Sequence, residues 1–86
     1  MEAFNKDGRV TLSMSLAEAS VLFERIAQAE FAEDLEVVTL SEPVEKKVFS
    51  SVQQALIGLI PGIGTDEYGP RMRASYESVD PGEFRL

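Results

Sequence analysis

The sequence predicts a small α+β domain, in which a short N-terminal strand or hairpin is followed by three helices. Three observations predict it: a turn with alternating apolar residues after it, a helix-capping motif that begins an apolar stripe, and a second, broader apolar stripe. With 86 residues, the chain has room for one small domain over 1–86, with 1–8 and 80–86 at its periphery.

The first element follows Asn5-Lys6-Asp7-Gly8, a strong turn signal in which Gly8 can adopt positive φ. After it, Val10, Leu12 and Met14 alternate with polar residues, which is the period of a half-buried strand. We therefore expect a strand over 9–14, as the second arm of an N-terminal hairpin.

The first helix is predicted by Ser15-Leu16-Ala17-Glu18, where Ser at the N-cap and Glu three residues later form a capping box. Continuing its helical wheel would place Glu30 near the centre of the apolar stripe, so the helix should end around 29–31. The apolar stripe comprises Leu16, Ala19, Ser20, Phe23, Ile26 and Ala27.

The second helix should begin at Ser41-Glu42-Pro43, with Ser41 as its N-cap, and should stop at Pro61-Gly62. Before it, the β-branched residues 37–40 are compatible with a short second strand. The broad apolar face of the helix places it at the centre of the domain, with the other two helices packed against it. That face comprises Val44, Val48, Phe49, Val52, Ala55, Leu56, Leu59 and Ile60.

Residues 71–79 fit both a helix and a strand. A helix gathers more of the large apolar residues into one stripe, and Gly69-Pro70 suits a helix start, so we expect a helix. A turn at Asp80-Pro81-Gly82 should follow, and Phe84 is the residue through which the tail would dock.

Composition excludes several kinds of chemistry. The chain has no Cys and no His, so Ser-His-Asp and Cys-His catalysis within one chain is impossible, and we expect neither a metal nor a cofactor. Asp and Glu number 15 against 8 Lys and Arg, for a net charge of -7. This charge argues against nucleic-acid binding and suits a basic protein partner.

A cytoplasmic protein is the expectation for cellular location. The N-terminal residues lack the basic and apolar regions of a secretory signal. The longest apolar run, 55–64, is about half of the ~20 residues that a membrane span needs, and Pro61 interrupts it, so no membrane association is expected.

Four groups of residues suggest a ligand, and each has a simpler interpretation. The acidic residues at 30–36 lack the spacing of a calcium loop, and the glycines of 62–67 follow a helix and lack the P-loop lysine. Arg71 and Arg73 lie between two tyrosines, and tyrosine and arginine side chains can stack on nucleic-acid bases. Pairing of these arginines with acidic residues of the same chain is favoured instead. Catalysis by Asp66, Glu67 and Glu77 needs a cleft that sequence does not reveal, so no enzyme is expected.

A protein interface is the better-supported candidate site. Val21 and Ile57 fall on the polar sides of their helices, where they form either part of an exposed apolar patch or ordinary scattered surface. The candidate interface, for a protein partner or a homodimer, comprises Val21, Leu22, Ile57, Ile60 and Ile63.

The chain resembles small uncharacterised proteins of actinobacteria and their phages. The resemblance rests on the strand at 10–13, the S-L-x-E-A pattern at 15–19, the apolar helix at 48–59 and the D-E-Y-x-x-x-M-x-x-x-Y pattern within 66–79. It implies no activity and no site residues, and Pro70 departs from the pattern.

The functional hypothesis is a small acidic non-enzymatic protein-interaction module: a regulator, an inhibitor, or a phage or host accessory factor. The alternatives are an inhibitor that mimics nucleic acid and a nucleic-acid binder that uses Arg71 and Arg73, with Lys46 and Lys47 completing a basic patch.

Overall fold

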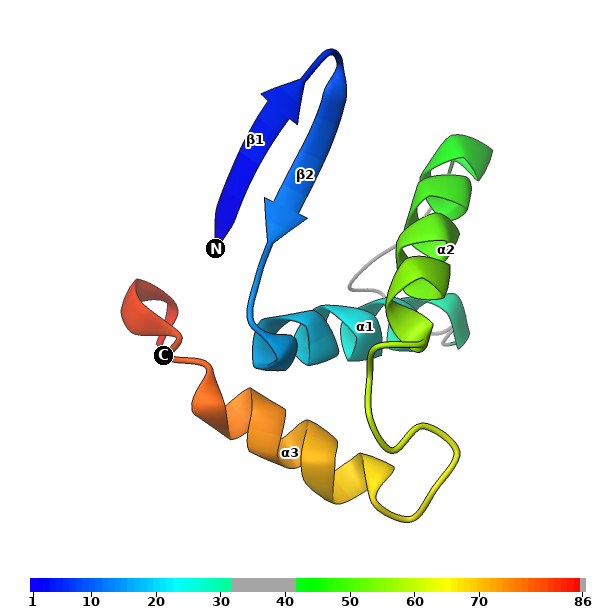
Figure 1. Ribbon diagram of the computed structural model, residues 1–86. Coiled ribbons are helices and arrows are strands. Elements are labelled where there is room, and N and C mark those ends of the chain that lie inside the picture. The colour runs from blue at the N-terminus through cyan, green and yellow to red at the C-terminus, as the bar shows by residue number, and fades with distance from the viewer. Residues whose placement is uncertain (32–41, 86) are drawn as a thin grey trace.

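In the computed structural model, an N-terminal β-hairpin is followed by three α-helices (Figure 1), which confirms the α+β class. The structure describes residues 1–31 and 42–85. The expected strand at 37–40 and most of the acidic cluster at 30–36 lie outside these ranges. The elements are β1 (Glu2–Lys6), β2 (Arg9–Ser13), α1 (Leu16–Phe31), α2 (Pro43–Ile57), α3 (Tyr68–Ser78) and the short 3-10 helix η1 (Gly82–Phe84).

The hairpin is antiparallel, with Lys6 opposite Arg9 at the turn and Phe4 opposite Thr11 in the middle. Asp7 and Gly8 form a two-residue turn with φ of 54° and 80°, which matches the right-handed twist of the strands. Every strand residue is exposed. The expectation of a half-buried strand was therefore wrong, because no other described element covers either face of the hairpin.

The capping box at the start of α1 is confirmed. The backbone N–H of Glu18 donates to Ser15 Oγ at 3.0 Å, and the backbone N–H of Ser15 donates to Glu18 Oε1 at 2.9 Å. These reciprocal bonds satisfy backbone donors that a helix start otherwise leaves unpaired. The helix ends at Phe31, within the expected range.

Both ends of α2 differ from the prediction. Its N-cap is Glu42 rather than Ser41, because Pro43 occupies the first helical position and the Glu42 N–H donates to Glu45 Oε1 at 3.3 Å. The helix ends at Ile57, four residues before the expected stop at Pro61-Gly62. A tight turn follows its end, in which the Leu59 N–H donates to the Leu56 carbonyl.

The third helix is confirmed over Tyr68–Ser78, with Pro70 in its first turn, where its missing N–H costs little. The tail does not dock as expected, since Phe84 is 80% exposed. It folds instead on itself: Asp80 Oδ1 accepts from the Gly82 N–H at 2.9 Å and from the Arg85 guanidinium at 3.1 Å.

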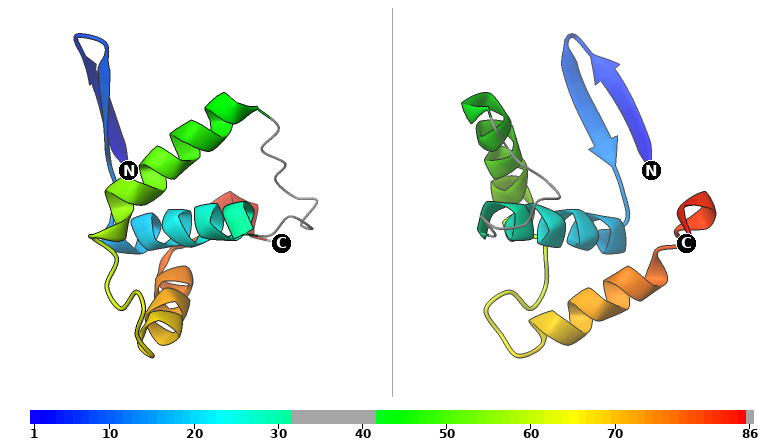
Figure 2. Two further views of the ribbon diagram at one scale, coloured as in Figure 1. Left: turned by 90° about the vertical axis from the view of Figure 1, so that its right-hand side faces the viewer. Right: turned by 180° about the vertical axis from the view of Figure 1, so that it is seen from behind.

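The centre of the domain is α1, not α2. The helices α2 and α3 lie on opposite sides of α1 and each packs against it (Figure 2, left). Small residues on α1 such as Ala19 and Ser20 allow close approach of its neighbours. By contrast, α2 contributes no buried residue. Among the described residues, the buried apolar side chains are Ala19, Phe23, Ile26, Ile60 and Met72.

The molecule is open for its size. Its accessible surface is 7024 Å², against roughly 5,000 Å² expected for a folded monomer of 9.5 kDa. Its radius of gyration is 14.3 Å, against about 12 Å for a compact domain of this length. The projecting hairpin accounts visibly for part of this difference (Figure 1).

Candidate interaction surfaces

The residues predicted as an interface have unequal exposure. Val21 and Leu22 on α1 are half-buried. Ile57, the last residue of α2, is 43% exposed, and Ile63 in the following loop is 37% exposed. Ile60 was wrongly assigned to the surface, because the tight turn after α2 directs it into the core, where it is only 6% exposed.

The apolar face of α2 is wider than α1 can cover. Its half-buried part includes Val52 and Leu56, and Leu56 packs against the core. At 100° per residue, the remaining part lies along one line at positions i, i+4 and i+11. Val44 is 71% exposed and Val48 is 59% exposed, and Ala55 is also exposed. We call Val44, Val48 and Ala55 the α2 stripe.

The hairpin presents two different faces. Residues that lie opposite each other in an antiparallel pair point to the same side. Ala3, Asn5, Val10 and Leu12 therefore share one face, of which Val10 is 73% and Leu12 51% exposed. The other face holds Phe4, which is 62% exposed, and the charged side chains of both strands.

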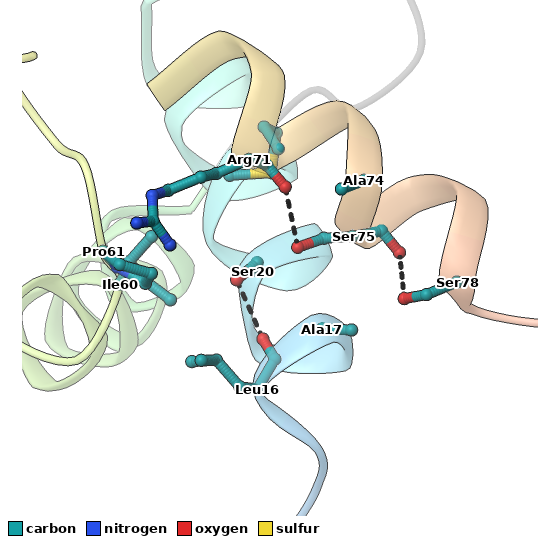
Figure 3. A pocket seen from close by; sticks show the side chains of 10 residues that line it. Leu16, Ala17, Ser20, Ile60, Pro61, Arg71, Ala74, Ser75 and Ser78 are labelled. Atoms are coloured by element: carbon teal, nitrogen blue, oxygen red, sulfur yellow. Dashed lines mark hydrogen bonds between the residues drawn. The ribbon is translucent and has the colours of Figure 1, made fainter. Parts of the chain in front are cut away.

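A groove of about 350 Å³ lies between the start of α1 and the face of α3 (Figure 3). This volume is at the lower end of the roughly 300–1,000 Å³ range of small-molecule sites. Its walls are mainly apolar, and Leu16, Ile60 and Met72 contribute to them. The Arg71 side chain extends to Pro61 and Ile60 at one end.

The polar groups of the groove are largely engaged with the protein. The hydroxyls of Ser20, Ser75 and Ser78 each donate to a backbone carbonyl within their own helix, at 2.8, 3.1 and 3.0 Å. Arg71 Nε donates to Glu67 Oε2 at 3.2 Å. No serine that lines the groove has a base beside it among the other lining residues.

Tyr68 and Glu24 form the polar link between α3 and α1. The Tyr68 hydroxyl donates to Glu24 Oε2. Burial, and then this hydrogen bond to a carboxylate, raise the pKa of Tyr68 well above its ordinary value. Burial likewise raises the pKa of Tyr76. Both tyrosines are thereby held in the neutral form, which suits a structural role.

The charged residues considered as sites do not converge. Asp66, Glu67 and Glu77 are all exposed, and Glu67 is engaged by Arg71. No group of three acidic side chains in the described part of the chain is placed to hold a metal ion.

The suggested basic patch is not a single surface. Lys46 and Lys47 are on α2, whereas Arg71 and Arg73 are on α3, and α1 separates the two helices (Figure 2). The pairing of Arg71 with an acidic residue, expected from the net charge, is confirmed at 3.2 Å.

No protein-family model, curated protein sequence or solved structure matches this chain. Within the described ranges, every helix is too short or too polar to cross a membrane.

Two exposed apolar surfaces, the α2 stripe and the hairpin, were not predicted from the sequence. A signal for the first existed, since the apolar face of the second helix spans more of the wheel than one neighbouring helix covers. For the second, the alternation of Val10 and Leu12 defined a face but not whether anything covers it.

Proposed function

We propose that this protein is a small acidic non-enzymatic protein-interaction module, which acts as a regulator, an inhibitor, or a phage or host accessory factor. The observation that carries the proposal is the exposure of Val44 and Val48 on the α2 stripe, at 71% and 59%. Large apolar side chains aligned on one face of a helix favour contact with a partner, because their burial releases water from apolar surface.

The partner is a protein with an apolar groove that accepts a helix. In this mode of recognition, the anchors follow the helical spacing of the α2 stripe. The net charge of -7 favours a partner with a basic surface, because long-range attraction accelerates the encounter. Association should therefore slow as salt concentration rises, while the apolar anchors maintain the complex.

Two variants of equal charge test this function by affinity capture. Val48→Glu places a carboxylate within the α2 stripe, whereas Gln54→Glu places one on an exposed position elsewhere on the same helix. A partner captured by the wild-type chain should be lost with Val48→Glu and kept with Gln54→Glu. Circular dichroism should give the same helical content for all three chains.

The proposal is contradicted if both variants retain the partner equally, or if the wild-type chain binds none. Equal loss with both variants would assign binding to overall charge rather than to the stripe.

A further inference from the structure

Both strands of the hairpin have an outer edge that no other described element covers. The hairpin contacts none of the helices. Figure 1 and the right-hand view of Figure 2 both place β1 on the far side of β2 from α2. A strand edge is a row of backbone N–H and C=O groups ready to pair, and a two-stranded hairpin alone is marginally stable. A third strand would pair with these backbone groups and would stabilise the hairpin.

The two-residue turn fixes which backbone groups of β1 point outward. It makes Lys6 and Arg9 the hydrogen-bonded pair that closes the turn, and the bonded pairs alternate from there. Phe4 therefore bonds across to Thr11. The N–H and C=O groups of Ala3 and Asn5 point away from β2, and these are the groups that a new strand would meet.

The strand β1 reads Glu2-Ala3-Phe4-Asn5-Lys6 and is complementary to itself in antiparallel pairing about Phe4. Glu2 then lies opposite Lys6 of the second copy, and Phe4 opposite its own counterpart. Ala3 lies opposite Asn5, so the outward backbone groups meet. Phe4 and the charges fall in the non-hydrogen-bonded pairs, where side chains approach most closely.

We propose that β1 pairs antiparallel with β1 of a second copy of this chain, in the register that sets Phe4 against Phe4. The product is a symmetric dimer with a four-stranded sheet, β2–β1–β1–β2. This inference deepens the proposed function by identifying one partner, a second copy of the chain. It rests on the proposed function in one respect, which is that the role of the chain is to associate with another protein chain.

Other pairings of the hairpin lack this complementarity. A shift of the β1 register by two residues sets a charged side chain opposite Phe4 and removes both opposite-charge pairs. Symmetric pairing of β2 about Thr11 sets Arg9 opposite Ser13, which offers it no countercharge. Charge thus favours the β1 edge and one register.

The exposed area is sufficient for a dimer. The accessible surface of 7024 Å² exceeds the expectation for a folded monomer by roughly 2,000 Å², whereas a standard interface buries about 800 Å² per partner. In the four-stranded sheet, the face with Val10 and Leu12 also holds Ala3 and Asn5 of both copies. Because β1 lies on the far side of β2 from α2 (Figure 1), a second copy paired along β1 lies away from the α2 stripe.

Sedimentation equilibrium of charge variants tests the register. The wild-type chain should have twice the single-chain mass of 9.5 kDa. Lys6→Glu turns two symmetric attractive pairs into repulsive ones, so the dimer should dissociate roughly tenfold more readily. Within the hairpin, the same change replaces the like-charge pair of Lys6 and Arg9 by an attractive one, so unfolding of the hairpin would not explain the loss. Glu2→Lys combined with Lys6→Glu should restore the wild-type dissociation constant.

A matched pair of proline variants tests the edge. Asn5 and Val10 are cross-strand partners whose N–H groups both point outward from the hairpin. Asn5→Pro removes a donor from the β1 edge and should give the single-chain mass. Val10→Pro removes the equivalent donor from the β2 edge and should leave the dimer intact.

Three results would overturn the inference. They are a wild-type chain of single mass at every concentration, equal dissociation constants for Lys6→Glu and the charge-swapped double variant, and loss of the dimer with Val10→Pro but not with Asn5→Pro. The proposed function is tested separately, because Val48→Glu should lose the heterologous partner.

Discussion

The hydroxyl of Tyr68 donates a hydrogen bond to the carboxylate of Glu24, and this contact joins α3 to α1 across 44 positions of the chain. Both residues are half-buried, beside the small core that Phe23 and Met72 help to form. In a core of this size, a single long-range polar contact to a charged acceptor is a substantial part of what holds α3 in place.

Tyr68→Phe should therefore lower the free energy of unfolding by about 1.5 kcal/mol, the lower end for a hydrogen bond to a charged group. Urea unfolding followed by circular dichroism measures it. Tyr76→Phe is the control, since the Tyr76 hydroxyl makes no hydrogen bond within the described ranges. Equal losses for the two variants would show that the bond to Glu24 contributes nothing specific.

Alkaline pH should destabilise the fold. Burial and the bond to Glu24 raise the pKa of Tyr68 above its ordinary value of 10.0, so the folded chain favours the neutral phenol more than the unfolded chain does. The resulting stability is complete below pH 10.0 and is lost as pH rises towards the folded-state pKa. Urea unfolding on both sides of this pH should give a falling free energy for the wild-type chain and a flatter profile for Tyr68→Phe. Parallel profiles would contradict the prediction.

Acid pH should weaken the start of α1. The backbone N–H of Ser15, and then its hydroxyl, lower the pKa of the Glu18 carboxyl below its ordinary value of 4.5. Because the folded-state pKa is depressed, this stabilisation is present above pH 4.5 and is lost as pH falls through the folded-state value. Glu18→Gln should remove this part of the acid transition, as measured by the helical circular dichroism signal. An unchanged acid transition would exclude a role for Glu18 in it.

Two glycines of the loop after α2 should differ in their tolerance of a side chain. Gly62 has φ of +86°, and a Cβ there would lie 3.1 Å from Arg71 Cδ and 3.2 Å from the Tyr68 backbone nitrogen. Gly64 has φ of +78°, but its Cβ would meet nothing within 4 Å. Gly64→Ala should cost about 1–2 kcal/mol from backbone strain alone, and Gly62→Ala about 1 kcal/mol more. Equal melting temperatures for the two variants would contradict this difference.

Local features of the fold were predictable because their causes are local. The turn at Asp7-Gly8 and the capping box at Ser15–Glu18 each depend on residues within four positions of one another. The position of α2 at the side of the domain was not predictable. Either of the first two amphipathic helices could form the centre of the domain. The central helix is the one against which the third helix can also pack, on the side opposite the other helix.

The candidate surfaces were predictable only in part. Ile57 and Ile63 were correctly expected to be exposed, but the burial of Ile60 depends on the tight turn that follows α2. The self-complementary pattern of Glu2, Phe4 and Lys6 is visible in the sequence. It acquires meaning only with the hairpin register, which determines the direction of each backbone group, and with the free outer edge of β1.

The central claim is that the fold leaves a surface for a second chain to cover, beginning at the β1 edge. Amide hydrogen exchange at a protein concentration above the dimer dissociation constant tests it most directly. The N–H groups of Ala3 and Asn5 should be protected, whereas those of Val10 and Leu12, which point outward from β2, should exchange freely. Equally fast exchange at all four positions would contradict the claim.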